Sequence, residues 1–158
     1  MICSHSHLDV ASSFEKAEFN KMLGNNYKAD QYIVNKQTRE LLALEEDKGN
    51  YVDKCFAKRA LWNAMETIAH CVENDMEVPY FILSCPTNFN IKPLFNNMSL
   101  VFKEDLLEQL HSKFKLFPLC DHGRTSRNKY LKERQMPFQI KEEFVFQETQ
   151  FLSNLGKA

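Results

Sequence analysis

The stretch "DKCFAKRALWNAMETIAHCVENDMEVPYFILSC", residues 53–85, decides the fold because it joins a strongly patterned helix to a buried strand. Between Asp53 and Asn74 the apolar residues recur at the three- and four-residue spacing of a helix, and most charged residues lie outside that stripe. The following "VPYFILSC", residues 78–85, is an uninterrupted apolar run of strand length that ends at Pro86. Such a run predicts a strand that is buried on both faces.

The residues before this stretch predict a helix and a hairpin. "DQYIVNKQTRELLAL", residues 30–44, has two short apolar runs around a polar connection, which is typical of a β-hairpin. Before it, a short helix is predicted to begin at Asp9 or Ser12, either of which can cap it, and to end at Gly24. The apolar positions of that helix are Val10, Phe14, Ala17 and Leu23. We expect residues 1–8 to form a loose N-terminal tail.

The residues after this stretch predict further elements of both types. "MSLVF", residues 98–102, is interpreted as a strand, and "KEDLLEQLHSKFKLF", residues 103–117, as a helix that Pro118 ends. The period of two in "PFQIKEEFVF", residues 137–146, predicts a strand, and "QETQFLSNL", residues 147–155, a terminal helix. Helices and strands thus mix without regular βαβ alternation. We therefore predict an α+β fold, a single compact domain with a mainly antiparallel sheet of about four to five strands against two or three amphipathic helices.

Length and composition favour an ordinary globular domain. The chain has 158 residues, 44% of them hydrophobic and 26% charged, so it can bury a core without a metal or disulfides. Its formal net charge is only −1. The whole molecule therefore lacks the strong positive field of a dedicated nucleic-acid coat, and any nucleic-acid contact is expected to be local.

Cysteine usage and the absence of long apolar runs indicate a cytoplasmic protein. The five cysteines are an odd set, widely separated in the chain, which favours reduced thiols over a disulfide framework. The amino terminus has no secretory pattern. No apolar run approaches the roughly 18 residues that a membrane-spanning helix needs, so no membrane association is expected.

The common catalytic motifs are missing from the sequence. The four glycines stand far apart, so neither a GxGxxG turn nor a GxxxxGK[ST] loop is present. There is also no GxSxG, HExxH or CxxC motif. We accordingly predict no nucleotide cofactor and no other cofactor, and we assign no catalytic residues.

Two metal-dependent alternatives fit parts of the sequence, but neither identifies metal ligands. Thiolate and imidazole groups suit tetrahedral zinc, but their spacing here matches no known zinc module, and two of the cysteines fall on apolar elements. Whether these groups converge in the fold stays open; they are His70, Cys71, Cys85, Cys120 and His122. Asp121 with Gln139 and Lys141 has the outline of a metal-dependent nuclease, and this is the third functional alternative.

The remaining candidate site is a basic segment, residues 122–134, inside "CDHGRTSRNKYLKERQMPF", residues 120–138. Its candidate binding residues are Arg124, Arg127, Lys129, Tyr130, Lys132 and Arg134. Guanidinium groups bind carboxylates in the same bidentate geometry as phosphates, so the partner is predicted to be an acidic protein surface or a nucleic acid. Simple solvation of an exposed segment is the alternative that needs no partner.

These observations favour a small, non-catalytic interaction protein that docks on a macromolecular partner through residues 122–134. A regulator or inhibitor, of the kind that viruses and mobile elements carry, fits this description. The second hypothesis is a nucleic-acid-binding protein that uses the same segment. The sequence does not indicate an oligomeric state.

Overall fold

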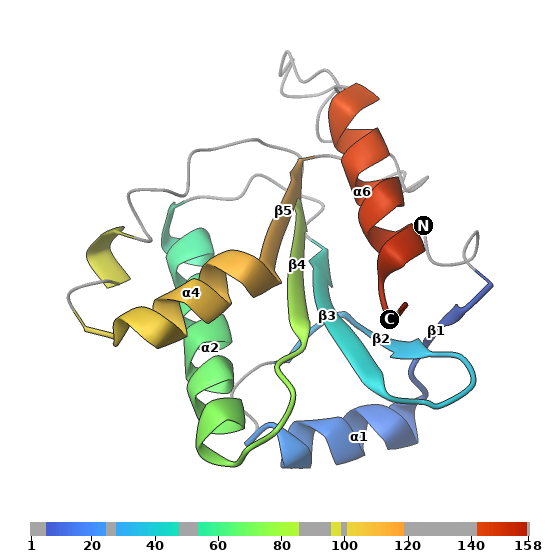
Figure 1. Ribbon diagram of the computed structural model, residues 1–158, viewed down its shortest axis with the longest axis horizontal. Helices are drawn as coiled ribbons and strands as arrows, with labels where there is room; N and C mark the ends of the chain where they lie inside the picture. The colour runs from blue at the N-terminus through green and yellow to red at the C-terminus, as the bar shows by residue number, and fades with distance from the viewer. Residues whose placement is uncertain are drawn as a thin grey trace.

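Figure 1 shows the fold, a computed structural model in which helices lie on both sides of one five-stranded sheet. The structure describes residues 6–24, 28–47, 54–85, 96–98, 101–118 and 142–157. The strands cross the sheet in chain order: β1 (Leu8–Val10), β2 (Gln31–Asn35), β3 (Leu41–Asp47), β4 (Tyr80–Cys85) and β5 (Phe114–Pro118). The longer helices among the described residues are α1 (Ser13–Met22), α2 (Lys54–Glu73), α4 (Glu104–Lys113) and α6 (Glu142–Asn154). The predicted α+β class and number of strands are confirmed.

The first three strands are antiparallel, and a tight hairpin joins β2 to β3. Tyr32 lies opposite Leu44 in this pair. In the turn, the Asn35 side-chain oxygen accepts hydrogen bonds from the backbone N–H groups of Gln37 and Thr38 at 2.9 and 3.0 Å. An asparagine that bonds to the backbone ahead of it is typical of such turns. The predicted hairpin is therefore confirmed.

The last three strands are parallel, so the sheet is mixed. Ala43 of β3 pairs with Tyr80 of β4, and Phe81 of β4 pairs with Phe114 of β5. Parallel neighbours require a long crossover, which α2 provides between β3 and β4. As predicted, β4 is buried on both faces: Phe81 packs into the core on one side and Ile82 into the core on the other.

The two faces of the sheet carry separate cores. The larger core contains the α2 stripe that the sequence predicted, with Leu61, Met65 and Ile68 almost fully buried. The second core contains Leu152 and Leu155 from the C-terminal end of the chain. Figure 1 accordingly shows α2 and α4 on one side of the sheet and α6 on the other.

Ser12, one of the two predicted caps, caps helix α1. The Ser12 hydroxyl accepts from the backbone N–H of Glu15 at 3.2 Å, and the Glu15 carboxylate accepts from the Ser12 N–H at 3.0 Å. This reciprocal pair is a capping box. The predicted apolar positions are only partly correct, because Val10 belongs to β1 and Phe14 is 76% exposed, whereas Leu23 is buried.

Two predictions between residues 98 and 117 were wrong in part. Met98 is helical, and its carbonyl accepts from the N–H groups of Val101 and Phe102 at 3.1 and 3.0 Å, so the described part of 98–102 is a turn and not a strand. The helix predicted over 103–117 ends at Lys113, and Phe114 already has an extended backbone. Phe114 and Phe117 fit helical spacing, but they lie in opposite cores, as residues of a strand do.

The strand predicted over residues 137–146 is also wrong where it can be checked. Residues 142–146 form the first part of α6, and residues 137–141 lie outside the described residues. The terminal helix predicted over 147–155 is confirmed, and it is longer than expected.

The end of α6 packs closely against the sheet. Gly156 has a φ of 77°, and a Cβ atom on it would lie 2.8 Å from Cδ1 of Leu42. Only glycine adopts this backbone conformation without strain and also permits this approach. Nearby, Nε2 of His7 lies 2.9 Å from the Leu155 carbonyl oxygen, which can only accept, so the ring donates and connects the entry of β1 to the end of α6.

Candidate functional site

The basic segment predicted as the binding site lies outside the described residues. This holds for Arg124, Arg127, Lys129, Tyr130, Lys132 and Arg134. It also holds for the nuclease residues Asp121, Gln139 and Lys141. In the chain, the segment connects the carboxyl end of β5 to the start of α6, both of which are described. These site predictions stay predictions.

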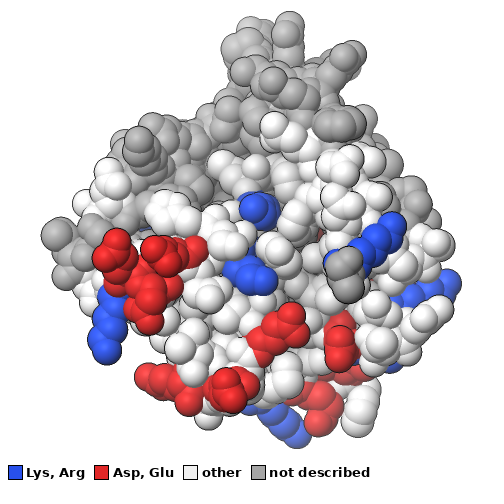
Figure 2. Space-filling view, viewed as in Figure 1, with Lys and Arg blue, Asp and Glu red and all other residues white. Residues whose placement is uncertain are grey.

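The charge of the protein is unevenly distributed along the chain. The described residues contain twelve Lys and Arg against eighteen Asp and Glu, a formal net charge of −6. Residues 119–141 contain six basic and two acidic residues, a net charge of +4. Figure 2 shows several groups of acidic side chains on the face it presents. The near-neutral total therefore combines an acidic body with a basic segment.

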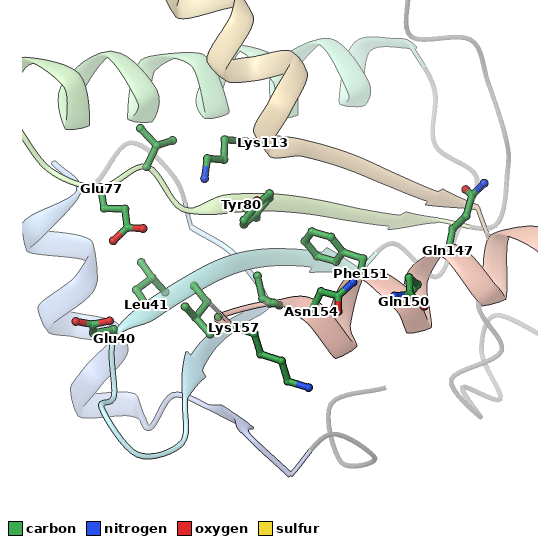
Figure 3. Close-up of a pocket in the computed structure, with 14 residues that line it drawn as sticks. Glu40, Leu41, Glu77, Tyr80, Lys113, Gln147, Gln150, Phe151, Asn154 and Lys157 are labelled. Carbon is green, nitrogen blue, oxygen red and sulfur yellow. The ribbon is translucent and has the colours of Figure 1, made fainter.

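The described residues also form an open groove beside α6, with a volume of about 640 Å³ (Figure 3). Its walls come from the starts of β3 and β4, the end of α4, and α6 with the residues after it. We call it the α6 groove. Its lining residues are Glu40, Leu41, Leu42, Glu77, Val78, Tyr80, Lys113, Gln147, Gln150, Phe151, Asn154, Leu155, Gly156 and Lys157.

Two aromatic rings form the apolar part of the α6 groove. Tyr80 and Phe151 meet edge to face, with centroids 5.1 Å apart, and the ring of Phe117 packs against Phe151 with a centroid distance of 5.8 Å. The Lys113 ammonium lies 4.1 Å from the centroid of the Tyr80 ring, a cation–π contact. The two groove rings are only half-buried, so each keeps a surface for an apolar group of a ligand.

Polar side chains surround these rings. Gln147, Gln150 and Asn154 are exposed and project from α6, while Glu40 and Glu77 stand before the starts of β3 and β4. Within the described part of the chain, none of these five side chains forms a hydrogen bond or an ion pair. An apolar surface with nearby uncommitted polar groups is the usual composition of a binding site.

Of the five side chains weighed as zinc donors, His70 and Cys71 are described, and both have structural contacts. Nε2 of His70 lies 3.1 Å from the carbonyl oxygen of Met22. Cys71 is fully buried in the larger core, and burial raises the pKa of its thiol, which disfavours the thiolate that zinc requires. Among the described residues no group of three or more metal-binding side chains occurs. Cys120 and His122 lie outside those residues, as does the side chain of Cys85.

Sequence reasoning missed two buried carboxylates. Glu45 on β3 is 6% exposed and Glu148 on α6 is 5% exposed. Glu45 is two residues from Ala43 in β3, so its side chain lies on the sheet face that α6 covers. Glu148 is four residues from Leu152 in α6, so its side chain lies on the face of the helix that packs against the sheet. Neither is without an interaction partner. A signal existed for Glu45, because it continues the period of two in β3, but the sequence did not show which face a helix covers.

Arg39 forms the most extensive ion-pair network among the described residues. It has a φ of 61°, and its guanidinium donates to Asp9 at 2.7 Å and to both carboxylate oxygens of Glu15 at 2.7 and 3.0 Å. The Arg39 hydrogen bonds, with help from the Ser12 backbone, lower the pKa of Glu15 from its usual 4.5 to about 2. This network fixes the hairpin turn against β1 and the start of α1, so we interpret it as structural.

We expect the contribution of Glu15 to stability to depend on pH. Because its folded pKa is lowered, the carboxylate stabilises the fold fully above about pH 4.5 and loses this effect as the pH falls toward 2. Urea unfolding at several pH values should therefore show Glu15→Gln less stable than wild type at pH 6, with the two converging near pH 2. Glu18→Gln, which removes a carboxylate from the same helix without touching Arg39, is the control. A constant difference for Glu15→Gln across this range would contradict the expected linkage.

The fold and the α6 groove together describe an α+β protein with a mixed sheet and an open groove that has apolar and polar walls. Comparison with known protein families, with curated proteins and with solved structures finds no match. No described helix is long and apolar enough to span a membrane.

Proposed function

We propose that the protein is a non-catalytic regulator or inhibitor that docks on an acidic protein surface through residues 122–134. The observation that carries this proposal is the separation of charge, with −6 on the described body and +4 on residues 119–141. A cationic segment attached to an acidic body attracts a local acidic patch on a partner. A long polyanion such as a nucleic acid would also lie close to the acidic body, which repels it over a distance of roughly 10 Å at 0.1 M salt. This repulsion favours an acidic protein patch as the partner.

Nucleic-acid binding through the same segment is the second candidate. Five basic residues with Tyr130 among them would suit a single strand, since bases stack on aromatic rings. Such binding has a measurable signature: neutralising about five phosphates of a single strand weakens the affinity about 100-fold between 50 and 200 mM salt. Docking on a protein surface has no comparable fixed dependence of affinity on salt concentration.

The test replaces Arg124, Arg127, Lys129, Lys132 and Arg134 with Glu. Wild type and variant are used for cross-linked capture of host proteins and for retention on immobilised DNA and RNA. We expect wild type to capture a partner with an acidic surface, the variant to lose it, and neither to be retained on nucleic acid at physiological salt. Steeply salt-dependent retention of wild type alone would instead support the second candidate.

A matched control separates a local effect from a change in total charge. Five exposed basic residues of the described body are replaced with Glu in the same way: Lys21, Lys28, Lys36, Lys58 and Arg59. This variant has the same net charge as the segment variant. If both variants lose the partner equally, the segment is not the docking site and the proposal fails.

A further inference from the structure

We infer that the α6 groove binds an extended segment of a partner protein in which a Lys or Arg neighbours an apolar side chain. This site is distinct from the basic segment and does not depend on the function proposed above. It is built from described residues at the amino ends of β3 and β4, at the end of α4 and along α6, whereas the basic segment leaves the carboxyl end of β5.

The rings of Tyr80 and Phe151 form the surface on which the apolar side chain of the ligand packs. A groove of about 640 Å³ lies within the usual range of ligand sites, about 300–1,000 Å³. Tyr80 and Phe151 are half-buried, and their edge-to-face contact fixes both rings. An apolar group that packs on them removes water from surface that the fold itself leaves exposed.

The backbone of the ligand is matched by the amides of α6. Gln147, Gln150 and Asn154 follow each other at spacings of three and four residues, which places them in one line along the helix. This line is roughly 10 Å long, about the length of three extended residues. Each amide both donates and accepts, as a peptide backbone does, and among the described residues none of the three is engaged.

The expected charge of the ligand follows from the two carboxylates at the end of the groove near the starts of β3 and β4. Glu40 and Glu77 are exposed and form no ion pair with any described residue, and Figure 3 shows both beside the strand starts. Two lysines also line the groove. The ammonium of Lys113, at the end of α4, already lies over the Tyr80 ring, and Figure 3 shows the side chain of Lys157 directed away from the two carboxylates. With a body of net charge −6 around it, this end of the groove favours a cationic side chain.

The test is a selection from a displayed library of random heptapeptides. Purified wild-type protein should enrich peptides in which Lys or Arg neighbours an aromatic or aliphatic residue. Synthetic copies of these peptides should bind at least 10-fold more weakly to Glu40→Gln/Glu77→Gln and to Gln150→Ala/Asn154→Ala. These exposed substitutions leave the core intact. Glu66→Gln/Glu73→Gln, at exposed positions of α2, is the matched charge control and should bind like wild type.

Three results would overturn the inference. They are no enrichment at all, enrichment only of acidic or uncharged peptides, and binding that the groove variants leave unchanged. The segment variant, with Glu at five positions between 124 and 134, should bind the selected peptides as well as wild type does. This last measurement keeps the inference separate from the proposed function, since either one can fail without the other.

Discussion

Phe81→Ala is expected to lower the free energy of unfolding by about 3–5 kcal/mol. Phe81 is fully buried in β4, which pairs with β3 on one side and β5 on the other. Truncation leaves a cavity between the sheet and α2 that the surrounding strands cannot close. Because a domain of this size is stable by only about 5–15 kcal/mol, the variant should lose a large part of its stability.

Urea unfolding followed by the fluorescence of Trp62 measures this loss. Trp62 is the only tryptophan and packs against the larger core, so it reports on the region around Phe81. Phe14→Ala is the matched control, because this phenylalanine is 76% exposed on α1 and its truncation should change stability by less than about 0.5 kcal/mol. Similar losses for the two variants would mean that β4 does not occupy the centre of the core.

The sequence predicted the elements whose pattern has a single interpretation. The α2 stripe is long enough to show its period several times, and β4 is an apolar run of strand length next to a proline. The hairpin was also recognised, because two apolar runs flank a polar turn. The hairpin and β4 form the centre of the sheet and α2 covers one of its faces, so the fold class followed from these three elements.

The incorrect elements have patterns that fit both helix and strand. Phe114 and Phe117 are three residues apart and would share one face of a helix, yet in β5 they face opposite cores. Whether such a short apolar run forms a helix or a strand depends on the elements that pack against it, and only the tertiary structure shows these. The same reason explains why the start of α6 was interpreted as a strand.

The α6 groove could not be predicted because its walls are far apart in the chain. Glu40, Glu77 and Lys113 stand near the starts of strands or the end of a helix, and only the parallel pairing of β3, β4 and β5 brings them near α6. One part had a local signal. The spacing of Gln147, Gln150 and Asn154 within the predicted terminal helix already placed three amides in a line.

Leu152→Ala tests whether α6 and its core are an integral part of the fold, and it should cost about 2–5 kcal/mol. Leu152 is 2% exposed and lies in the second core, on the opposite side of the sheet from Trp62. The two cores share β4, since Phe81 belongs to one and Ile82 to the other. Loss of packing in the second core should therefore reach the first through this strand.

The measurement compares two signals during urea unfolding of Leu152→Ala. If the sheet couples the cores, far-ultraviolet circular dichroism and Trp62 fluorescence should change together, both at a lower urea midpoint than in wild type. Thr149→Ala, at an exposed position of the same helix, should leave the midpoint unchanged or slightly raised, because alanine is the better helix former.

A loss of helical signal before any change at Trp62 would show that α6 unfolds separately. In that case the α6 groove would form only while the helix is docked, and peptide binding should decline with the circular dichroism signal and not with the fluorescence.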